Sequence, residues 1–308
     1  MLQQQNQSIR QASLYSQVTD RIIAELEQGI VPWVQPWGSE EGSAGLGLPR
    51  NARTAKAYSG INILLLWAAI MQGGYASQHW LTFKQALELG GCVRKGENGW
   101  TVCYADSFIP KDEKDRASKD GSDPQSIPFL KRYTVFNVAQ CDGLPEGICP
   151  LPAIADERQL IPRAEALIAA TGANFQIGGE IACYIPSLDA IRVPPQAAFH
   201  DQINFYRTVF HELDHWTGHV TRLARDLTTK FSSDGYAREE LVAELATAFV
   251  CASLGIVPTV RHADYIGNWL QVLKEDSRAI FKAASMASKA CDYILAFEQN
   301  PFVAEVAA

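Results

Sequence analysis

The chain shows two hydrophobic periods, and each period predicts a different kind of element. Apolar residues spaced three and four apart predict a helix with one buried face, and short β-rich runs predict strands. In the first half of the chain these patterns predict three helices and two strands, at residues 15–29, 60–71, 82–89, 100–105 and 132–138. Gly29 favours the left-handed backbone of a helix end, and Thr82 with Gln85 forms a capping box.

Residues 143–157 interrupt these patterns. They hold three prolines and two glycines with little periodicity, which is typical of a linker between domains. After them the patterns predict four helices, the last one broken, and two short strands, at residues 157–170, 198–217, 237–254, 263–297, 181–185 and 190–193. The chain is therefore predicted to be an α+β protein of two domains, an N-terminal α/β domain over residues 1–145 and a C-terminal domain over residues 152–308.

Two segments of the N-terminal half carry no clear period. Residues 31–37 hold two prolines and two tryptophans, and they are predicted to be extended rather than helical. Residues 111–126 are charged, contain Gly and Pro, and have almost no apolar side chain. This composition predicts a solvated loop between the two strands.

The overall composition is that of an ordinary globular chain. The 308 residues are 47% hydrophobic and 20% charged, which excludes a collagen, a coiled coil and a wholly disordered chain. The longest apolar run, residues 63–71, is far shorter than the roughly 20 residues of a membrane span, and the N-terminus has no apolar signal segment. No membrane partner is therefore expected. The seven cysteines include no C-x-x-C pair, so we expect reduced thiols and a cytoplasmic location.

The clearest chemical motif is His211-Glu212-Leu213-Asp214-His215. A helix places side chains four residues apart on one face, so His211 and His215 can bind the same metal ion. Glu212 lies beside the first ligand and is placed to take a proton from water at the metal. This H-E-x-x-H pattern is typical of zinc hydrolases and predicts Glu212 as the catalytic base.

A catalytic metal site needs a third protein ligand and an open position. Glu240 and Glu244 share one face of the predicted helix 237–254, so we expect Glu240 to bind the metal and Glu244 to accept a hydrogen bond from an imidazole. Glu239 points about 100° away and is expected to face solvent. The alternative is an amphipathic helix whose acidic first turn is favoured by the helix dipole. Zn²⁺ is the expected ion, and Mn²⁺ and Co²⁺ also suit these ligands.

Three neighbours of the motif are further candidates. His219 follows His215 by four residues, but Gly218 is expected to end the helix and leave His219 at the surface. Tyr236 is placed to donate to an oxyanion, although a core or surface role is the simpler interpretation. By analogy with zinc hydrolases, the strand at 189–193 is expected to be an edge strand along which a peptide substrate lies.

The N-terminal half has the composition of a single-strand nucleic-acid binder. The net charge of the chain is −7, but residues 50–100 carry six basic and two acidic side chains. Aromatic residues are interleaved with these basic side chains. Such a mixture suits a nucleic acid, because aromatic rings stack on nucleobases and basic side chains pair with phosphates. The candidate DNA-binding residues are Arg50, Arg53, Lys56, Lys84, Arg94, Lys95, Trp33, Trp37 and Trp80. Burial in the core is the alternative for the tryptophans, and Trp67 is assigned to the core.

Several blocks of the sequence resemble the ArdC antirestriction family. Its N-terminal domain, shared with TraC-type plasmid primases, is similar to residues 14–37, 49–67, 79–99 and 133–145. Its zincin-like metallopeptidase domain is similar to residues 211–219, 236–249 and 265–285. The resemblance implies an N-terminal domain that binds single-stranded DNA. It also implies that His211, Glu212 and His215 are the motif residues and that the stretch Glu240 to Ala243 supplies the third ligand.

The resemblance further implies a plasmid-borne protein that protects DNA entering a new host from restriction endonucleases. Single-stranded DNA is the expected partner, and double-stranded DNA stays open. A first alternative is an active zinc metalloprotease that cleaves an unknown host protein and uses the N-terminal domain for localisation on DNA. A second alternative is a DNA-binding protein whose metal site is only structural. No primase domain follows the matching blocks, so primase activity is not implied.

Overall fold

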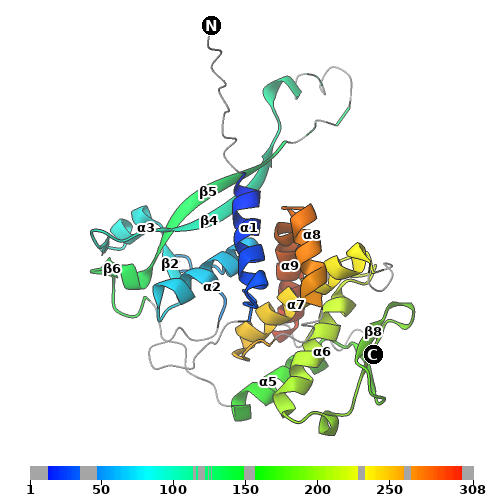
Figure 1. Cartoon of the computed structure of the whole chain (residues 1–308). Coiled ribbons are helices and arrows are strands. Elements are labelled where there is room, and N and C mark those ends of the chain that lie inside the picture. The colour runs from blue at the N-terminus through cyan, green and yellow to red at the C-terminus, as the bar shows by residue number, and fades with distance from the viewer. Residues whose placement is uncertain are drawn as a thin grey trace.

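A computed structural model describes the chain at residues 13–34, 47–113, 116, 122–123, 125, 127–148, 157–227, 233–259 and 265–299. The N-terminal part is a sheet with short helices, and the C-terminal part is a helical bundle with a small sheet (Figure 1). This architecture confirms the prediction of a two-domain α+β protein. The predicted linker and the loop at 111–126 lie partly outside the described residues, and the domain boundaries stay a prediction.

The N-terminal part is built around a four-stranded sheet in the order β1-β2-β5-β4. Its elements are α1 (Leu14–Glu27), β1 (Arg50–Asn51), α2 (Ile61–Gly73), β2 (His79–Leu81), α3 (Phe83–Glu88), β3 (Cys92–Val93), β4 (Trp100–Phe108), β5 (Ile127–Asn137), the 3-10 turn Val138–Gln140 and β6 (Cys141–Asp142). The predicted capping box begins α3, because the Gln85 N–H donates to Thr82 Oγ1 and the Thr82 N–H donates to Gln85 Oε1. All three predicted helices are confirmed. The strands β1, β2, β3 and β6 were not predicted, since two or three residues are too few to show a period.

The strands β4 and β5 form a long antiparallel ribbon that projects from the body of the molecule (Figure 1). At its base the side chains of Val102 and Val135 are buried in the core. Further along, Tyr104 and Tyr133 are 49% and 47% exposed. The ribbon therefore presents side chains that the rest of the protein does not cover.

Within the described residues of the C-terminal part, five helices pack beside a three-stranded sheet in the order β7-β9-β8. Its elements are α5 (Glu157–Ala170), β7 (Asn174–Ile177), β8 (Cys183–Ile185), the 3-10 turns Pro186–Leu188 and Gln196–Ala198, β9 (Ala190–Val193), α6 (Gln202–Thr217), α7 (Asp234–Leu254), α8 (Ile266–Glu275) and α9 (Ala279–Gln299). The predicted break in the last helix separates α8 from α9, and the predicted hairpin joins β8 to β9. None of the described helices combines the length and the apolar character that crossing a membrane requires.

The two parts share one hydrophobic core. Helix α1 packs against α8, and α2 packs against α9. The rings of Trp33 and Trp269 meet edge to face with centroids 5.6 Å apart, and those of Trp67 and Phe249 do the same at 5.6 Å. Trp67 is fully buried, as predicted. Side-chain packing thus joins the N-terminal and C-terminal parts in addition to the chain itself.

Candidate metal centre and nucleic-acid surface

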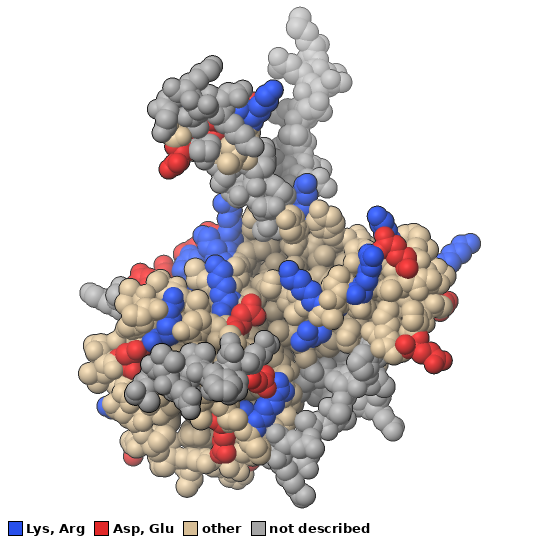
Figure 2. Space-filling view, turned by 180° about the vertical axis from the view of Figure 1, so that it is seen from behind, with Lys and Arg blue, Asp and Glu red and all other residues tan. Residues whose placement is uncertain are grey.

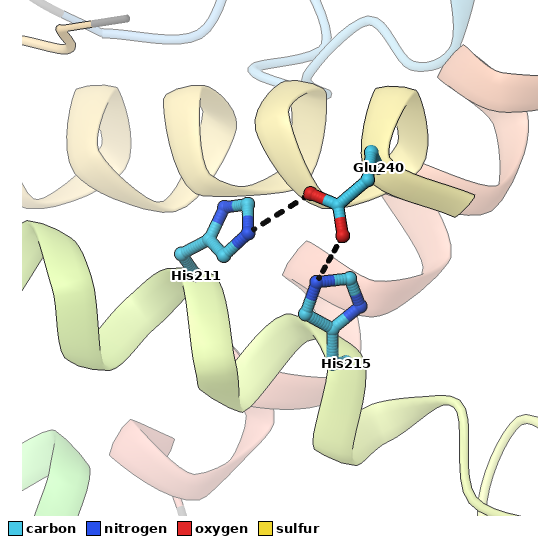
Figure 3. Close-up of side chains that lie close together, drawn as sticks. All are labelled: His211, His215 and Glu240. Carbon is cyan, nitrogen blue, oxygen red and sulfur yellow. Dashed lines mark ion pairs between the residues drawn. The ribbon is translucent and has the colours of Figure 1, made fainter. Parts of the chain in front are cut away.

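Helix α6 presents His211 and His215 on the face that turns toward α7 (Figure 3). The two residues lie one turn apart, and the centroids of their rings are 4.9 Å apart. The helix ends as predicted before Gly218, whose N–H donates to the His215 carbonyl. His219 therefore lies beyond the helix, where its Nδ1 is 2.8 Å from the hydroxyl of Thr221.

Glu240 of α7 lies between the two imidazoles (Figure 3). Its Oε2 is 3.5 Å from His211 Nε2, and its Oε1 is 3.5 Å from His215 Nε2. One ligand atom from each of the three residues can be chosen so that all lie within 4.8 Å of one another. The structure thus brings together the three side chains that the sequence selects as metal ligands.

This donor set fits a divalent metal. Two imidazole nitrogens and one carboxylate oxygen are common ligands of Zn²⁺, and they also accept Mn²⁺ and Co²⁺. Three protein ligands leave coordination positions open for water or a substrate. Across the described part of the chain, this is the group of His, Cys, Asp or Glu side chains that lie close enough to share one ion.

The side chain of Glu239 is only 11% exposed, and the expectation that it faces solvent is wrong. Its Oε1 lies 3.3 Å from His215 Nδ1 and accepts a 2.9 Å hydrogen bond from Arg225 Nη2. Glu239 and Glu240 are adjacent on α7, and both point into the protein. The turn that carries Arg225 covers the side of the helix at Glu239, which solvent would otherwise reach. An Nδ1–H bond to Glu239 leaves the Nε2 atom of His215, which faces Glu240, available to bind a metal ion.

The charges of this network shift the pKa values of its members. Burial lowers the pKa of His215, but Glu239 and Glu240 outweigh burial and raise it well above 6.5. Burial raises the pKa of Glu240, but hydrogen bonds from the two imidazoles hold it far below 4.5. Desolvation raises the pKa of the fully buried Asp214 to about 6. A proton on His215 therefore competes with a metal ion for the same nitrogen.

Glu212 lines a cavity of about 220 Å³ that also contains the three candidate ligands. The carboxylate is 6% exposed, and the thiol-bearing Cys183 of β8 lines the same space. A general base has to lie within reach of the water that it activates. Glu212 shares this cavity with the three candidate ligands, and its role as the general base stays a prediction.

Tyr236 stands on the first turn of α7 and lines the same cavity. Ser233 begins this helix, since its hydroxyl accepts the Tyr236 N–H at 3.2 Å. Burial, Tyr265 and Glu240 raise the pKa of Tyr236 well above 10, so its hydroxyl keeps its proton. Glu244 is buried one turn beyond Glu240, and its expected hydrogen bond to an imidazole stays a prediction.

The edge strand beside the cavity is β8, and the expectation that residues 189–193 form it is wrong. The strand β9 is central, because it pairs in parallel with β7 and antiparallel with β8. Tyr184 of β8 lines the cavity, and its hydroxyl donates to Asp189 at 2.8 Å. Arg222 holds the same carboxylate from the other side. The turn after β8 is thereby fixed next to the metal position.

Two of the tryptophans expected to stack on bases are in the core. Trp33 and Trp80 are 0% exposed. Trp33 packs on Trp269, and Trp80 packs edge to face on Tyr75. Neither ring is available to a nucleotide, which corrects the sequence-based assignment. Trp37 lies outside the described residues.

The basic candidates are all exposed, but half of them have acidic partners. The Arg94 guanidinium is 2.7 Å from Glu97, and Arg53 and Lys84 both pair with Glu88. These pairs neutralise part of the predicted basic surface. No ion pair within the described residues involves the other three, which are Arg50, Lys56 and Lys95.

The β4–β5 ribbon carries a group of side chains that is not among the candidates predicted from the sequence; it is called the ribbon cluster and consists of Tyr104, Lys131, Arg132 and Tyr133. The two tyrosine rings meet edge to face at 6.1 Å, and Lys131 is the register partner of Tyr104. All four side chains are exposed. Figure 2 shows basic side chains gathered where the ribbon joins the body. In the sequence, the cluster could have been found from the adjacent basic and aromatic residues 131–133. Arg132 and Tyr133 are predicted there only as part of the strand at 132–138.

Two family models match the chain. One describes the N-terminal domain of anti-restriction factor ArdC and matches residues 12–136. The other describes a zincin-like metallopeptidase and matches residues 162–286. The metallopeptidase match contains α6, α7 and therefore all the candidate ligands.

Related sequences fall into two length classes. Two proteins of Escherichia coli named DNA primase TraC are 40% identical over 299 and 296 residues, and the chain spans only 27% and 20% of their lengths. An uncharacterized protein of Sinorhizobium fredii, y4eC, is 40% identical over 291 residues, which cover 93% of both chains.

Solved structures resemble the whole chain. The metal-free crystal structure of the antirestriction protein ArdC from plasmid R388 matches with a TM-score of 0.77 and 41% identity. Its Mn(II)-bound crystal structure matches with a TM-score of 0.75 and 40% identity. Each match covers 94% of this chain and 99% of the other.

Proposed function

The chain belongs to the ArdC antirestriction family, and from this premise we propose that it protects incoming plasmid DNA from host restriction endonucleases by binding single-stranded DNA. The observation that carries the proposal is the match to the plasmid R388 protein over nearly the full length of both chains. We propose a cytoplasmic location, because the six cysteines among the described residues are free thiols.

The surface proposed for DNA combines the ribbon cluster with Arg50, Lys56 and Lys95. Exposed tyrosine rings offer faces on which bases stack, and nearby cations neutralise phosphates. Arg132 is anchored to the body, since its Nη2 donates to Gln17 Oε1 at 2.8 Å. Single-stranded DNA is favoured over duplex because stacking on aromatic rings needs unpaired bases.

Protection by this surface is proposed to work by occlusion. A protein that covers a strand blocks a nuclease in proportion to the strand that it covers, and no chemical step is required. Binding is expected to weaken as salt rises, with a slope set by the number of phosphates contacted. Occlusion therefore predicts that protection follows DNA occupancy and not the metal content of the protein.

The metal centre is proposed to hold one divalent ion through His211, His215 and Glu240. Zn²⁺ is the proposed ion, with Mn²⁺ and Co²⁺ as alternatives, and the Mn(II)-bound crystal structure of a relative supports a divalent metal. Metal analysis of the purified full chain identifies the ion. Comparable amounts of Zn²⁺, Mn²⁺ and Co²⁺ in the purified chain would contradict a site that is specific for one ion.

An active metalloprotease that cleaves a host protein is the second candidate function. It is favoured by Glu212, which lines the cavity beside the ligands, because a purely structural metal site has no use for a general base. When bound, the metal supplies Lewis-acid polarisation of a carbonyl. Glu212 takes a proton from water in the cavity, the Tyr236 hydroxyl donates to the oxygen on which charge develops, and Glu239 keeps His215 oriented.

The experiment that separates the two functions compares the wild-type full chain with Glu212→Ala. Occlusion predicts that the variant protects transferred DNA and purified single strands nearly as well as the wild type. Loss of protection with unchanged DNA affinity would instead assign antirestriction to proteolysis of a host protein. The full chain is required, because the N-terminal part shares its core with α8 and α9.

A further inference from the structure

A second cavity adjoins the metal centre and is not used by the proposed function. Its volume is about 600 Å³, which is within the range of small-molecule sites. It lies between α7 and α9 and is closed on one side by the turn at residues 222–226. Glu239 lines both this cavity and the cavity of the metal centre. The two cavities therefore share a wall.

The lining of the second cavity is mostly apolar. Leu241 and Val242 come from α7, and Ala279, Ala283 and Met286 come from one face of α9. The first four are buried in the core, whereas Met286 is 43% exposed. An apolar molecule in this cavity would cover the exposed part of Met286 and gain the free energy of burying apolar surface.

The rim of the same cavity carries an excess of positive charge. Arg238 and Lys282 both approach a single carboxylate, Asp276, at 3.4 and 3.3 Å. One negative charge is thus shared by two cations. Lys289 lies two turns further along α9, is exposed, and takes part in no ion pair among the described residues. The rim therefore complements an anion placed above an apolar floor.

The shared wall is held by Arg225, whose side chain is 5% exposed. Its Nη2 donates to Glu239 at 2.9 Å and to the Asp214 carbonyl at 2.6 Å, and its Nη1 donates to Thr217 at 2.8 Å. Glu239 in turn holds His215 Nδ1. One buried guanidinium thus connects the second cavity to a candidate metal ligand.

Arg222 makes a second connection from the same turn. Its Nε donates to the Trp216 carbonyl at 2.6 Å, and its guanidinium holds Asp189, which accepts from Tyr184 in the metal cavity. Between the two arginines, Ala224 has a positive φ of 50°, which is costly for a residue other than glycine. The turn keeps this strained backbone because both of its arginines are anchored.

We propose that the second cavity binds an anionic amphiphile, a small molecule with an apolar body and one carboxylate or phosphate, and that its occupancy tightens metal binding through the turn at 222–226. The apolar body lies on the α7 and α9 floor, and the anion lies between Lys282 and Lys289. A ligand packed against the turn holds Arg225 on Glu239 and so keeps His215 oriented for the metal. Linkage requires the reciprocal effect, in which the metal tightens ligand binding by the same factor.

The test uses the purified full chain and decanoate at concentrations below micelle formation, with titration calorimetry as the readout. We expect saturable binding of one decanoate per chain. Lys282→Glu with Lys289→Glu should weaken it at least tenfold, and Ala283→Phe, which fills the floor, should abolish it. Lys111→Glu, at an exposed lysine that does not line the cavity, is the matched control and should change the affinity less than twofold. Circular dichroism spectra show whether Ala283→Phe still folds. The two lysine changes test the site without altering its core.

Ligands that share the apolar chain but differ in head group show which kind of anion the site binds. Decyl phosphate with the same variant profile supports the site, and decanol should bind at least tenfold more weakly than decanoate. Vesicles of phosphatidylcholine and phosphatidylglycerol should not retain the protein, because the cavity takes a single free molecule. Retention on vesicles without saturable decanoate binding, or equal affinity for decanol, would overturn the proposal.

The coupling is tested with Mn²⁺ affinity measured with and without saturating decanoate. We expect the ion to bind at least threefold more tightly in its presence, and decanoate to bind more tightly by the same factor when Mn²⁺ is present. Mn²⁺ affinity that is the same with and without decanoate would overturn the coupling. Decanoate binding does not depend on antirestriction, on proteolysis or on a metal. The coupling rests on the proposed metal site, and Mn²⁺ binding measured without decanoate tests that site by itself, so a failure of the site and a failure of the coupling are distinguishable.

Discussion

The metal centre and the ribbon cluster differ in how the fold positions their side chains. His211, His215 and Glu240 come from two helices that pack on each other, and each is largely buried. Tyr104 and Tyr133 come from a two-stranded ribbon and are half-exposed. A buried cluster is held to one geometry by its surroundings, whereas an exposed cluster is ordered mainly by the partner that it meets.

The comparison predicts that each region can be damaged without harm to the other. Variants of the metal centre should change metal retention or peptide hydrolysis and leave DNA affinity unchanged. Variants of the DNA surface should do the opposite.

Glu212→Ala removes the proposed general base. Any peptide hydrolysis at the metal centre should fall by about 10²–10⁴-fold, which is the usual contribution of acid–base catalysis. Metal content and single-strand affinity should stay at wild-type values, because Glu212 is neither a candidate ligand nor part of the DNA surface. Cleavage of a casein-type substrate, metal analysis and a DNA-binding titration measure the three quantities. A parallel loss of DNA binding would show that the metal centre and the DNA surface are not independent.

Glu240→Ala removes one of three ligands. Metal affinity should fall by more than about 100-fold, since loss of a residue that only orients a ligand already costs roughly 10–100-fold. Dialysis against a chelator followed by metal analysis measures it. Glu275→Ala, on the exposed face of α8, is the control and should retain the metal. Equal retention in both variants would remove Glu240 from the site.

Charge reversal at Arg50, Lys56 and Lys95 together tests the other region. DNA affinity at low salt should fall by roughly 100-fold or more, and the salt dependence should become shallower as phosphate contacts are lost. Protection should fall with it, while metal content stays unchanged. Lys274→Glu, on α8, serves as a single-charge control. Full protection by the triple variant would locate the DNA surface elsewhere.

Glu239→Gln tests the hydrogen bond behind His215. Metal affinity at pH 8 should fall by about 10–100-fold, because the imidazole loses its charged partner. The carboxylate also raises the pKa of His215, so its removal lowers that pKa. Protons then compete less at low pH, and the variant should lose less of its metal affinity between pH 8 and pH 6 than the wild type. A variant with the wild-type pH profile would show that Glu239 does not act on His215.

Tyr104→Ala and Tyr133→Ala should have the smallest effect. Each ring that stacks on a base contributes about 1–3 kcal/mol, so affinity for single strands should fall while the salt slope stays the same. Tyr→Phe at either position keeps the ring and should bind like the wild type. Fluorescence anisotropy with a labelled oligonucleotide at two salt concentrations separates stacking from phosphate contacts.

The two regions also differ in how far the sequence predicts them. His211 and His215 are predictable because the spacing of four residues has a direct meaning in a helix. Glu239 is not, because helical geometry alone places it about 100° from Glu240 and cannot show that the turn with Arg225 covers that side. The sequence describes one helix, and the error comes from a neighbour contributed by another segment.

The DNA surface is harder to predict for a related reason. Trp33 and Tyr104 are both aromatic residues of the N-terminal half, yet Trp33 is 0% exposed and Tyr104 is 49% exposed. Trp33 is buried by Trp269, more than two hundred positions later in the chain. Composition identifies residues that can stack on a base, but exposure depends on tertiary contacts that no local pattern records.

The shared core between α1, α2, α8 and α9 has a consequence for inheritance. A recombination event that moved residues 12–136 alone would carry away Trp33 and leave Trp269 with an uncovered apolar face. Both products would lose packing that neither half can replace, and exposed apolar surface favours aggregation. The two halves are therefore expected to be inherited as one gene segment. The TraC primases fit this expectation, since they match 93% and 92% of this chain within proteins several times longer.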